Sequence, residues 1–260
     1  MSIMNSLAIQ QRVVHALLLR EMLTRYGKNN IGFLWLLAEP LLFMSAILIL
    51  AINIRMDQLN LAIPLAAFAL TGYSGAFAWR DIANQCKNAM RANSGLMHHR
   101  NVKILDIFIS RILLEFISNT ATFIILILIL VNVGLINFPV NTLYVIFGWL
   151  LLNWFGGAIG LCLGILSEYS EVFGRIWNAT SFPIFAVSGA AFFVDWMPEP
   201  IRSYLLWVPM IHGIETMRHG FFGDIVTTYE DPMYFITVNL CFTLVGLLLV
   251  KNFSEGLLND

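Results

Sequence analysis

Long apolar stretches are the feature that most constrains the fold of this chain. Six of them follow one another along the 260 residues, separated by shorter polar segments. Roughly 20 apolar residues match the hydrocarbon core of a bilayer, which is about 30 Å thick. Because backbone N–H and C=O groups find no water partner in lipid, each stretch is expected to be a helix. The sequence therefore predicts an all-α integral membrane protein with six transmembrane helices.

The composition excludes a soluble globular domain. Hydrophobic residues make up 58% of the chain and charged residues 12%. A soluble domain has about 25% charged residues and is less apolar. Six spans use about half of the chain, so we expect modest loops and no large domain outside the membrane.

The predicted boundaries follow the alternation of apolar and polar segments. A cytoplasmic N-terminal segment, 1–31, precedes a transmembrane domain, 32–251, and a short cytoplasmic tail, 252–260. The six spans are predicted at 32–53, 61–79, 112–135, 143–166, 177–194 and 233–250. The segment 80–111 is too charged to cross. The segment 195–232 is interrupted by prolines, glycines and charges, so we expect re-entrant or interfacial helices there.

Basic residues predict the orientation. With the N-terminus inside, twelve Lys and Arg residues fall in the inner segments and three, Arg55, Arg202 and Arg218, in the outer ones. Lys and Arg concentrate in short cytoplasmic loops, so both termini are predicted to be cytoplasmic. The apolar run 13–19 is not read as a cleaved signal peptide, because His15 interrupts it and no small-x-small cleavage site follows.

Catalytic and metal-binding motifs do not stand out in the sequence. HExxH, GxSxG and a Gly-rich phosphate loop are absent, so the chain is not expected to hydrolyse ATP itself. The three cysteines form no CxxC pair, which disfavours a disulfide framework or a zinc site. His212 and His219 could share a helix face as metal ligands, but without a Cys/His cluster nearby we favour polar anchors at an interface.

Three charged residues in or near the spans are candidate functional groups. Arg111 and Glu115 are four residues apart, a spacing that brings side chains together on a helix, so we predict a structural ion pair near the inner interface. Glu39 lies about 10 Å inside the first span by helical rise, and Pro40 after it frees a backbone carbonyl. Glu39 fits a structural hinge or a conduit lining equally well.

Small and aromatic residues mark two further spans. Gly156, Gly160 and Gly164 repeat every four residues, which permits close approach of another helix, either within the subunit or across a dimer. Phe182 and Phe185 flank a proline in the fifth span. Their rings would stack on sugars in a pore or, as is common in membrane helices, face lipid or core.

Three blocks of the sequence resemble a known family. Residues 16–40 read ALLLREMLTRYGKNNIGFLWLLAEP, which is similar to the "LRE…TR(F/Y)GK" and "G(F/Y)LW…EP" patterns of bacterial capsular polysaccharide export permeases, the membrane subunits of ABC exporters of the second type. The blocks 95–103, GLMHHRNVK, and 203–209, SYLLWVP, agree with the same family. The resemblance covers nearly the whole chain. Asn101 departs from it, because relatives usually carry proline there.

The resemblance implies a homodimer with two copies of a separate ATP-binding subunit, so that this chain needs no cofactor. It also implies an interface helix within 1–31, although the helix candidate 7–26 has no amphipathic stripe of its own. The segment 80–111 would receive the ATPase movement through Arg91, Arg100, Lys103 and Asp106. For any one of the three basic residues, contact with a lipid headgroup is an equal alternative. Further expected positions are basic residues at the inner mouth, Arg20, Arg25 and Lys28, and conduit residues, Trp35, Glu39, Phe182 and Phe185.

The expected function is export of a lipid-linked, acidic capsular polysaccharide across the bacterial inner membrane, with ATP hydrolysis in the partner subunit. Periplasmic and outer-membrane export components are further expected partners, and nucleic acid is not. Three alternatives stay open at this point: an O-antigen or teichoic acid permease, a drug or lipid exporter permease, and a non-transporting membrane scaffold.

Overall fold

A computed structural model describes residues 3–26, 42, 46, 63–93, 95 and 102–259 of the chain. Within these ranges, side chains are described for 9–23, 42, 46, 63–93, 95 and 102–256. Apart from Leu42 and Ala46, the predicted first span, 32–53, lies outside the described residues. The other five predicted spans lie within them, except for residues 61 and 62.

Helices and turns make up the described part of the chain, without a β-strand, as the all-α prediction requires. In chain order the elements are α1 (Ile3–Tyr26), α3 (Leu65–Lys87), α4 (Ala89–Ala92), α5 (Ile104–Asn132), α6 (Thr142–Tyr169), α7 (Glu171–Val187), η3 (Val194–Trp196), α8 (Glu199–Leu205), α9 (Pro209–Phe222), η4 (Gly223–Ile225) and α10 (Pro232–Asn259).

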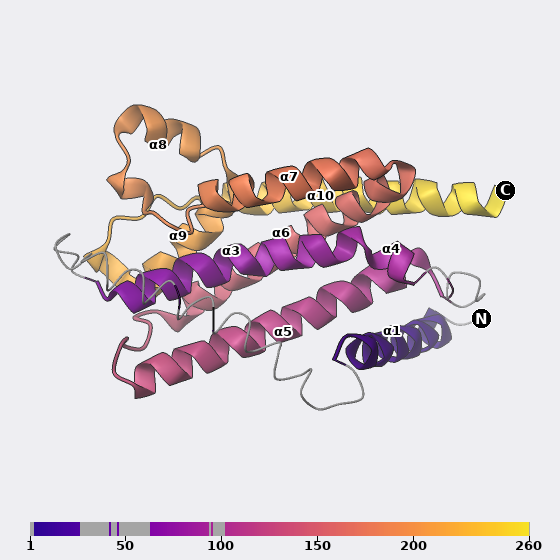
Figure 1. Ribbon diagram of the computed structural model, residues 1–260, viewed down its shortest axis with the longest axis horizontal. Coiled ribbons are helices and arrows are strands. Elements are labelled where there is room, and N and C mark those ends of the chain that lie inside the picture. The colour runs from indigo at the N-terminus through magenta and orange to yellow at the C-terminus, as the bar shows by residue number, and fades with distance from the viewer. Residues whose placement is uncertain are drawn as a thin grey trace.

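Three of the described helices are long and apolar enough to cross a membrane: Ile104–Asn132, Thr142–Tyr169 and Pro232–Gly256. These are α5, α6 and most of α10, at the third, fourth and sixth predicted spans. Helices α3 and α7, at the second and fifth, lie along the same long axis (Figure 1). Helices α8 and α9 lie at one end of this bundle, within the predicted external segment 195–232.

Polar residues explain where α6 and α7 begin. Asn141 precedes α6, and its side-chain oxygen accepts a hydrogen bond of 3.3 Å from the backbone N–H of Tyr144. Ser170 separates the two helices, and its hydroxyl accepts a hydrogen bond of 3.3 Å from the backbone N–H of Val172. Such side chains provide acceptors for the first N–H groups of a helix, which have no intrahelical partner. A single residue thus reverses the chain between α6 and α7.

Helix α6 is the centre of the bundle, because 72% of its most apolar window is buried, against 33% for α5 and 22% for α10. A Cβ on Gly156 would lie 2.6 Å from the carbonyl oxygen of Trp79, and one on Gly164 would lie 2.9 Å from that of Cys86. A Cβ on Gly160 would lie 2.8 Å from the Cβ of Cys86. The glycine repeat therefore packs on α3 within the same subunit, which answers the alternative that the sequence left open.

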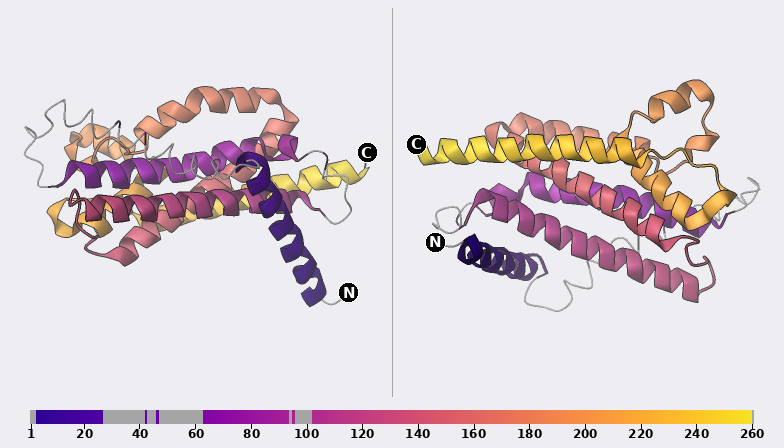
Figure 2. Two further views of the ribbon diagram at one scale, coloured as in Figure 1. Left: turned by 60° about the horizontal axis from the view of Figure 1, so that its bottom comes forward. Right: turned by 180° about the vertical axis from the view of Figure 1, so that it is seen from behind.

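Helix α1 runs across the bundle rather than along it (Figure 2). Its Leu17 belongs to the same buried apolar cluster as Ile107 and Phe108 of α5. Helix α1 lies at the end of the bundle where α10 finishes, and α9 lies at the opposite end (Figure 1). These two ends are called the α1 end and the α9 end below.

Candidate functional site

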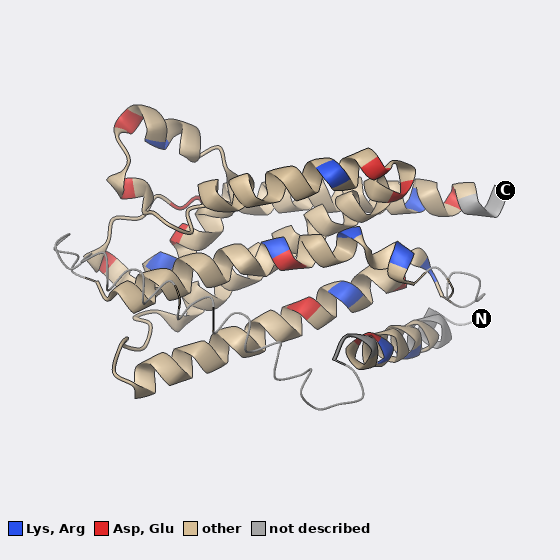
Figure 3. Ribbon diagram, in the orientation of Figure 1, with Lys and Arg blue, Asp and Glu red and all other residues tan. Residues whose placement is uncertain are grey.

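Charged residues lie toward both ends of the bundle and within α3 and α5 (Figure 3). Helices α6 and α10 are uncharged through their middles, whereas α3 and α5 carry charged residues well inside their lengths. Charges within membrane helices are rare and usually paired or functional. The polar groups at the α1 end, along α3 and at the α9 end are therefore the candidate sites.

A buried ion pair joins Glu21 of α1 to Arg111 of α5. Their side chains are 9% and 5% exposed, respectively. Arg111 also donates a hydrogen bond of 3.3 Å to Oε1 of Gln85 on α3. Glu115 is buried one turn further along α5, and the pair predicted between it and Arg111 stays a prediction. Arg111 thus connects three helices at the α1 end.

Asp106 fixes the start of α5 and joins it to α1. Its Oδ2 accepts a hydrogen bond of 2.9 Å from the backbone N–H of Lys103, and its Oδ1 accepts one from the side-chain amide of Gln10. Asp106 is buried, whereas the side chain of Lys103 is exposed. Of these two predicted coupling residues, Lys103 is exposed, whereas Asp106 is buried and makes its contacts within the fold.

Two basic residues lie at the short helix α4, one on the helix itself and one on α1 beside its end. Arg91 on α4 is 54% exposed, and its guanidinium lies 3.8 Å from the carboxylate of Glu168 and 3.5 Å from that of Glu171. Exposed ion pairs contribute only about 0–1 kcal/mol, so these contacts leave Arg91 available to a partner. Arg20 on α1 donates a hydrogen bond of 3.0 Å to the side-chain oxygen of Asn93, directly after α4.

Several predicted site residues have no described side chain. Lys28, Trp35, Glu39 and Arg100 lie outside the described residues. Arg25 lies in α1, and its side chain is not among those described. Their predicted roles stay predictions.

Phe185 of α7 lies against α3. Its ring centroid is 5.0 Å from that of Phe77 and 6.1 Å from that of Tyr73. The guanidinium carbon of Arg80 lies 5.5 Å from the same centroid. Phe182 stacks on Phe185 at 6.2 Å and is 65% exposed. The two predicted conduit aromatics therefore lie together, one buried against α3 and one at its outer edge.

Further contacts between α3 and α7 continue toward the α1 end. Trp177 donates a hydrogen bond of 2.7 Å from its indole nitrogen to the side-chain oxygen of Asn84. Lys87 donates one to the side-chain oxygen of Asn178. The α3–α7 seam is defined as eight residues, Tyr73, Phe77, Arg80, Asn84 and Lys87 on α3 and Trp177, Asn178 and Phe185 on α7.

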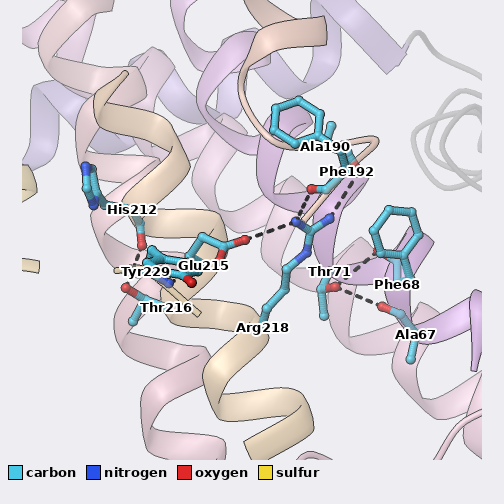
Figure 4. Close-up of polar contacts among 10 residues, drawn as sticks. All are labelled: Ala67, Phe68, Thr71, Ala190, Phe192, His212, Glu215, Thr216, Arg218 and Tyr229. Atoms are coloured by element: carbon cyan, nitrogen blue, oxygen red, sulfur yellow. Dashed lines mark hydrogen bonds and ion pairs between the residues drawn. The ribbon is translucent and has the colours of Figure 1, made fainter. Parts of the chain in front are cut away.

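Arg218 of α9 is fully buried, with 0% of its side chain exposed, at the α9 end (Figure 4). It forms an ion pair of 3.3 Å with Glu215 and donates hydrogen bonds of 2.6 Å to the carbonyl of Phe192 and 3.4 Å to that of Ala190. The guanidinium also lies 4.3 Å from the ring centroid of Phe193. Arg218 therefore ties α9 to the turn that follows α7.

Both carboxylate oxygens of Glu215 have partners. Glu215 is 1% exposed, and its second carboxylate oxygen accepts a hydrogen bond of 3.3 Å from the backbone N–H of Tyr229. The guanidinium of Arg218 lies 4.8 Å from the ring centroid of Phe68 at the start of α3. Buried charges persist when they are paired and hydrogen-bonded, so this network fixes the positions of α3, α9 and the chain before α10.

The two histidines of α9 are engaged in hydrogen bonds. Nδ1 of His212 accepts a bond of 2.9 Å from the backbone N–H of Asp231, so Nε2 carries the proton and donates 2.9 Å to the carbonyl of Leu206. Burial lowers the pKa of His212, which keeps it neutral. Nδ1 of His219 lies 3.1 Å from Thr228 Oγ1. Among the described residues no cluster of three or more His, Cys, Asp or Glu could hold a metal ion.

Sequence reasoning missed the buried pair in α9, because the charge count treated Arg218 as an exposed external residue. A usable signal was present. Glu215 and Arg218 are three residues apart in one helix, and that spacing places side chains on the same face. The partner of Arg111 had no such signal, since Glu21 lies on another helix.

Comparison with known proteins gives close relatives. The model of a family described as ABC-2 type transporter matches residues 12–222. Two relatives are "Capsule polysaccharide export inner-membrane protein BexB" of Haemophilus influenzae, 43% identical over 97% of this chain and 95% of that protein, and the protein of the same description named CtrC of Neisseria meningitidis, 42% identical over 98% of this chain and 96% of that protein. "Polysialic acid transport protein KpsM" of Escherichia coli is 30% identical over 97% of both chains.

Proposed function

Since the chain belongs to the family of ABC-2 type transporters, we propose that it is the permease subunit of an ATP-driven exporter of lipid-linked capsular polysaccharide in the bacterial inner membrane. The observation that carries the proposal is 43% identity over 97% of the chain to a protein named for capsule polysaccharide export. Identity of that extent covers the described bundle and both of its ends.

The membrane topology is part of the proposal: six spans with both termini in the cytoplasm. Three helices of spanning length support it. Helix α1 and the end of α10 lie at one end of the bundle, and α3 begins at the other (Figure 1). A first span between α1 and α3 would connect the α1 end to the α9 end, where α3 begins. On this topology the α1 end is cytoplasmic and the α9 end is external.

We further propose that two copies of the chain work with two copies of a soluble ATP-binding subunit. The sequence has no phosphate loop, so the energy source must be separate. Two exposed basic residues, Arg91 on α4 and Lys103 directly before α5, support docking of an acidic partner surface at the α1 end. Arg100, between them in sequence, is assigned to the same surface.

The exported chain would enter at the α1 end and leave at the α9 end. Arg20, Arg25 and Lys28 are assigned to the inner mouth, where positive charge attracts an acidic glycan. Phe182 and Phe185 are assigned to the conduit together with Trp35 and Glu39 of the first span. The stacking of Phe182 on Phe185 beside α3 supports that assignment.

Deletion of the gene in its own host tests the function. We expect surface capsular polysaccharide to disappear and to accumulate inside the cell, and a plasmid copy to restore it. Loss of O-antigen or teichoic acid with an intact capsule would indicate the other glycan exporters instead. Normal capsule in the deletion strain would exclude the proposed function.

Co-purification with the neighbouring ATP-binding subunit tests the assembly. We expect both chains in equal numbers and an ATPase activity that depends on the permease. A non-transporting scaffold would give neither result.

A further inference from the structure

One face of α3 repeats polar and aromatic residues along its length. Tyr73, Phe77, Arg80, Asn84 and Lys87 follow one another at intervals of four, three, four and three residues. At 100° per residue they all lie within about 80° of one another around the helix. All five side chains are partly buried.

The opposite face of α3 is the one that packs on α6. Gly75, Trp79, Ile82 and Cys86 are the residues on that face that approach α6. The polar face of α3 is therefore not needed for this packing, and it meets α7 along the α3–α7 seam instead.

Arg80 lies deep in the bundle. Trp79, its neighbour in sequence, packs against Gly156, which is close to the midpoint of α6 (Thr142–Tyr169). Helix α6 is long and apolar enough to span a membrane. The second span predicted from sequence ends at residue 79, but α3 continues without a break to Lys87. Arg80 thus holds a positive charge near the middle of the spanning region.

The charge of Arg80 has no acidic partner among the residues that the structure describes. Its described contact is the Phe185 ring, 5.5 Å from the guanidinium carbon. Its Nε is buried and has no hydrogen-bond partner in the described part of the chain. Asp81 lies about 80° around the helix from the middle of the polar face. A charge at this depth is normally paired or part of a pathway. Arg80 is therefore a candidate binding group for an anionic substrate.

The seam offers the chemistry that an acidic sugar chain requires. The guanidinium of Arg80 can bind a carboxylate with two parallel hydrogen bonds. The rings of Tyr73, Phe77 and Phe185 provide apolar faces for sugar rings. Asn84 and Lys87, which hydrogen-bond to Trp177 and Asn178 across the seam, add polar groups toward the α1 end. In the seam a guanidinium lies beside an aromatic ring, and in an acidic sugar a carboxylate lies beside the apolar face of the pyranose. The guanidinium would pair with the carboxylate and the aromatic ring with the sugar face.

We propose that the α3–α7 seam is the subsite that binds acidic sugar units of the glycan during export, with Arg80 as the specificity-determining residue. The inference rests on the proposed function. It adds the residues that bind the negative charge of the substrate. A relative named for transport of polysialic acid, a polymer of carboxylated sugars, is 30% identical to the chain.

The test uses the full transporter in its own host, with the chromosomal gene deleted. Arg80→Gln is expected to lower the export rate of the acidic capsule about tenfold, the effect of losing one charged hydrogen-bond partner. Arg80→Lys should retain most of the export. Arg175→Gln is the matched control, since Arg175 is an exposed arginine on α7 outside the seam. Equal export by wild type and Arg80→Gln at equal membrane levels would overturn the inference.

Photo-cross-linking gives a second readout that does not depend on the Arg80 variants. A benzophenone amino acid at Phe182, which stacks on Phe185, should cross-link to glycan during export. The same probe at Leu248, an exposed residue of α10, should not. Cross-links from Phe182 to phospholipid alone would also overturn the subsite. Failure of the wild-type plasmid to restore the capsule would instead count against the proposed function itself.

Discussion

Glu21 and Arg111 form a buried ion pair that joins the helix lying across the bundle to a helix of spanning length. Removing one partner of such a pair leaves an uncompensated charge, which costs about 3–5 kcal/mol. We therefore expect Glu21→Ala to lower the thermal stability of the purified protein clearly. Glu255→Ala, which breaks an exposed pair with Lys251, should change stability by less than about 0.5 kcal/mol. Equal melting temperatures for the two variants would contradict the assigned role.

Arg218 is predicted to be essential for folding of the α9 end. Arg218→Met leaves Glu215 buried without its charge partner, and we expect a loss of about 3 kcal/mol or more. The double variant Arg218→Met/Glu215→Leu removes both charges and should recover part of that loss. The stability of both variants is measured by unfolding in detergent, with the yield of monodisperse protein as the readout. A double variant less stable than Arg218→Met would argue against the pairing.

Gly156 and Gly157 make a matched pair for the packing of α6. A Cβ at Gly156 would lie 2.6 Å from a backbone oxygen of Trp79, whereas one at Gly157 would make ordinary contact, 3.4 Å from Ile112. Gly156→Ala should therefore cost about 1–3 kcal/mol through overpacking, and Gly157→Ala should be near neutral. Comparing their melting temperatures checks the prediction, and the reverse order would show that α3 does not rest on Gly156.

Acidification should loosen the α9 end through His212. Burial lowers the pKa of His212 below the ordinary value of 6.5. The folded state then prefers the neutral ring, so its stabilising contribution is present above about pH 6.5 and is lost as the pH falls toward the folded-state pKa. We expect melting temperature to fall between pH 7.5 and 5.5, and His212→Gln to reduce the slope. His15→Gln, at an exposed position of α1, should leave the slope unchanged.

Arg91 should affect coupling rather than folding. Its two ion pairs are long, and Arg91 is 54% exposed while Glu168 is 22% exposed, so Arg91→Ala is expected to change stability by no more than about 1 kcal/mol. If it contacts the ATP-binding subunit, permease-dependent ATPase activity should fall by about threefold or more. Lys251→Ala, another exposed basic residue near the same end, serves as the control. Full activity of Arg91→Ala would remove it from the coupling surface.

Apolar run length was enough to predict the three helices that are long and apolar enough to cross a membrane, α5, α6 and α10, because the hydrocarbon thickness fixes how many residues a span needs. At the fifth predicted span, 177–194, helix α7 already ends at Val187. Run length did not predict that α3 continues past Arg80, since a charged residue ends an apolar run whether or not the helix ends there. Nor did charge counting separate Arg218, buried between aromatic rings, from Arg202, which lies beside exposed acidic residues. Counting Lys and Arg by segment records the charge of each residue and the segment in which it lies. It contains no information on whether the side chain is buried.

Only part of the candidate site was predicted from the sequence, because sequence rules contain no information on which helices lie side by side. Rules based on spacing reach only along one helix, so they connect Glu215 with Arg218 but not Glu21 with Arg111. Phe185 stood out in the sequence as an aromatic residue two positions after a proline. Its neighbours Tyr73, Phe77 and Arg80 are identified only by the contacts between α3 and α7.

The attachment of α1 has a mechanical consequence. Gln10 and Glu21 hold α1 to α5 at two points, through Asp106 and Arg111, and Arg20 adds a third point at Asn93. A single attachment point would let α1 rotate about it, whereas two contacts to α5 and one to Asn93, directly after α4, fix its angle to the bundle. We therefore expect a movement of α1 to be transmitted to α5.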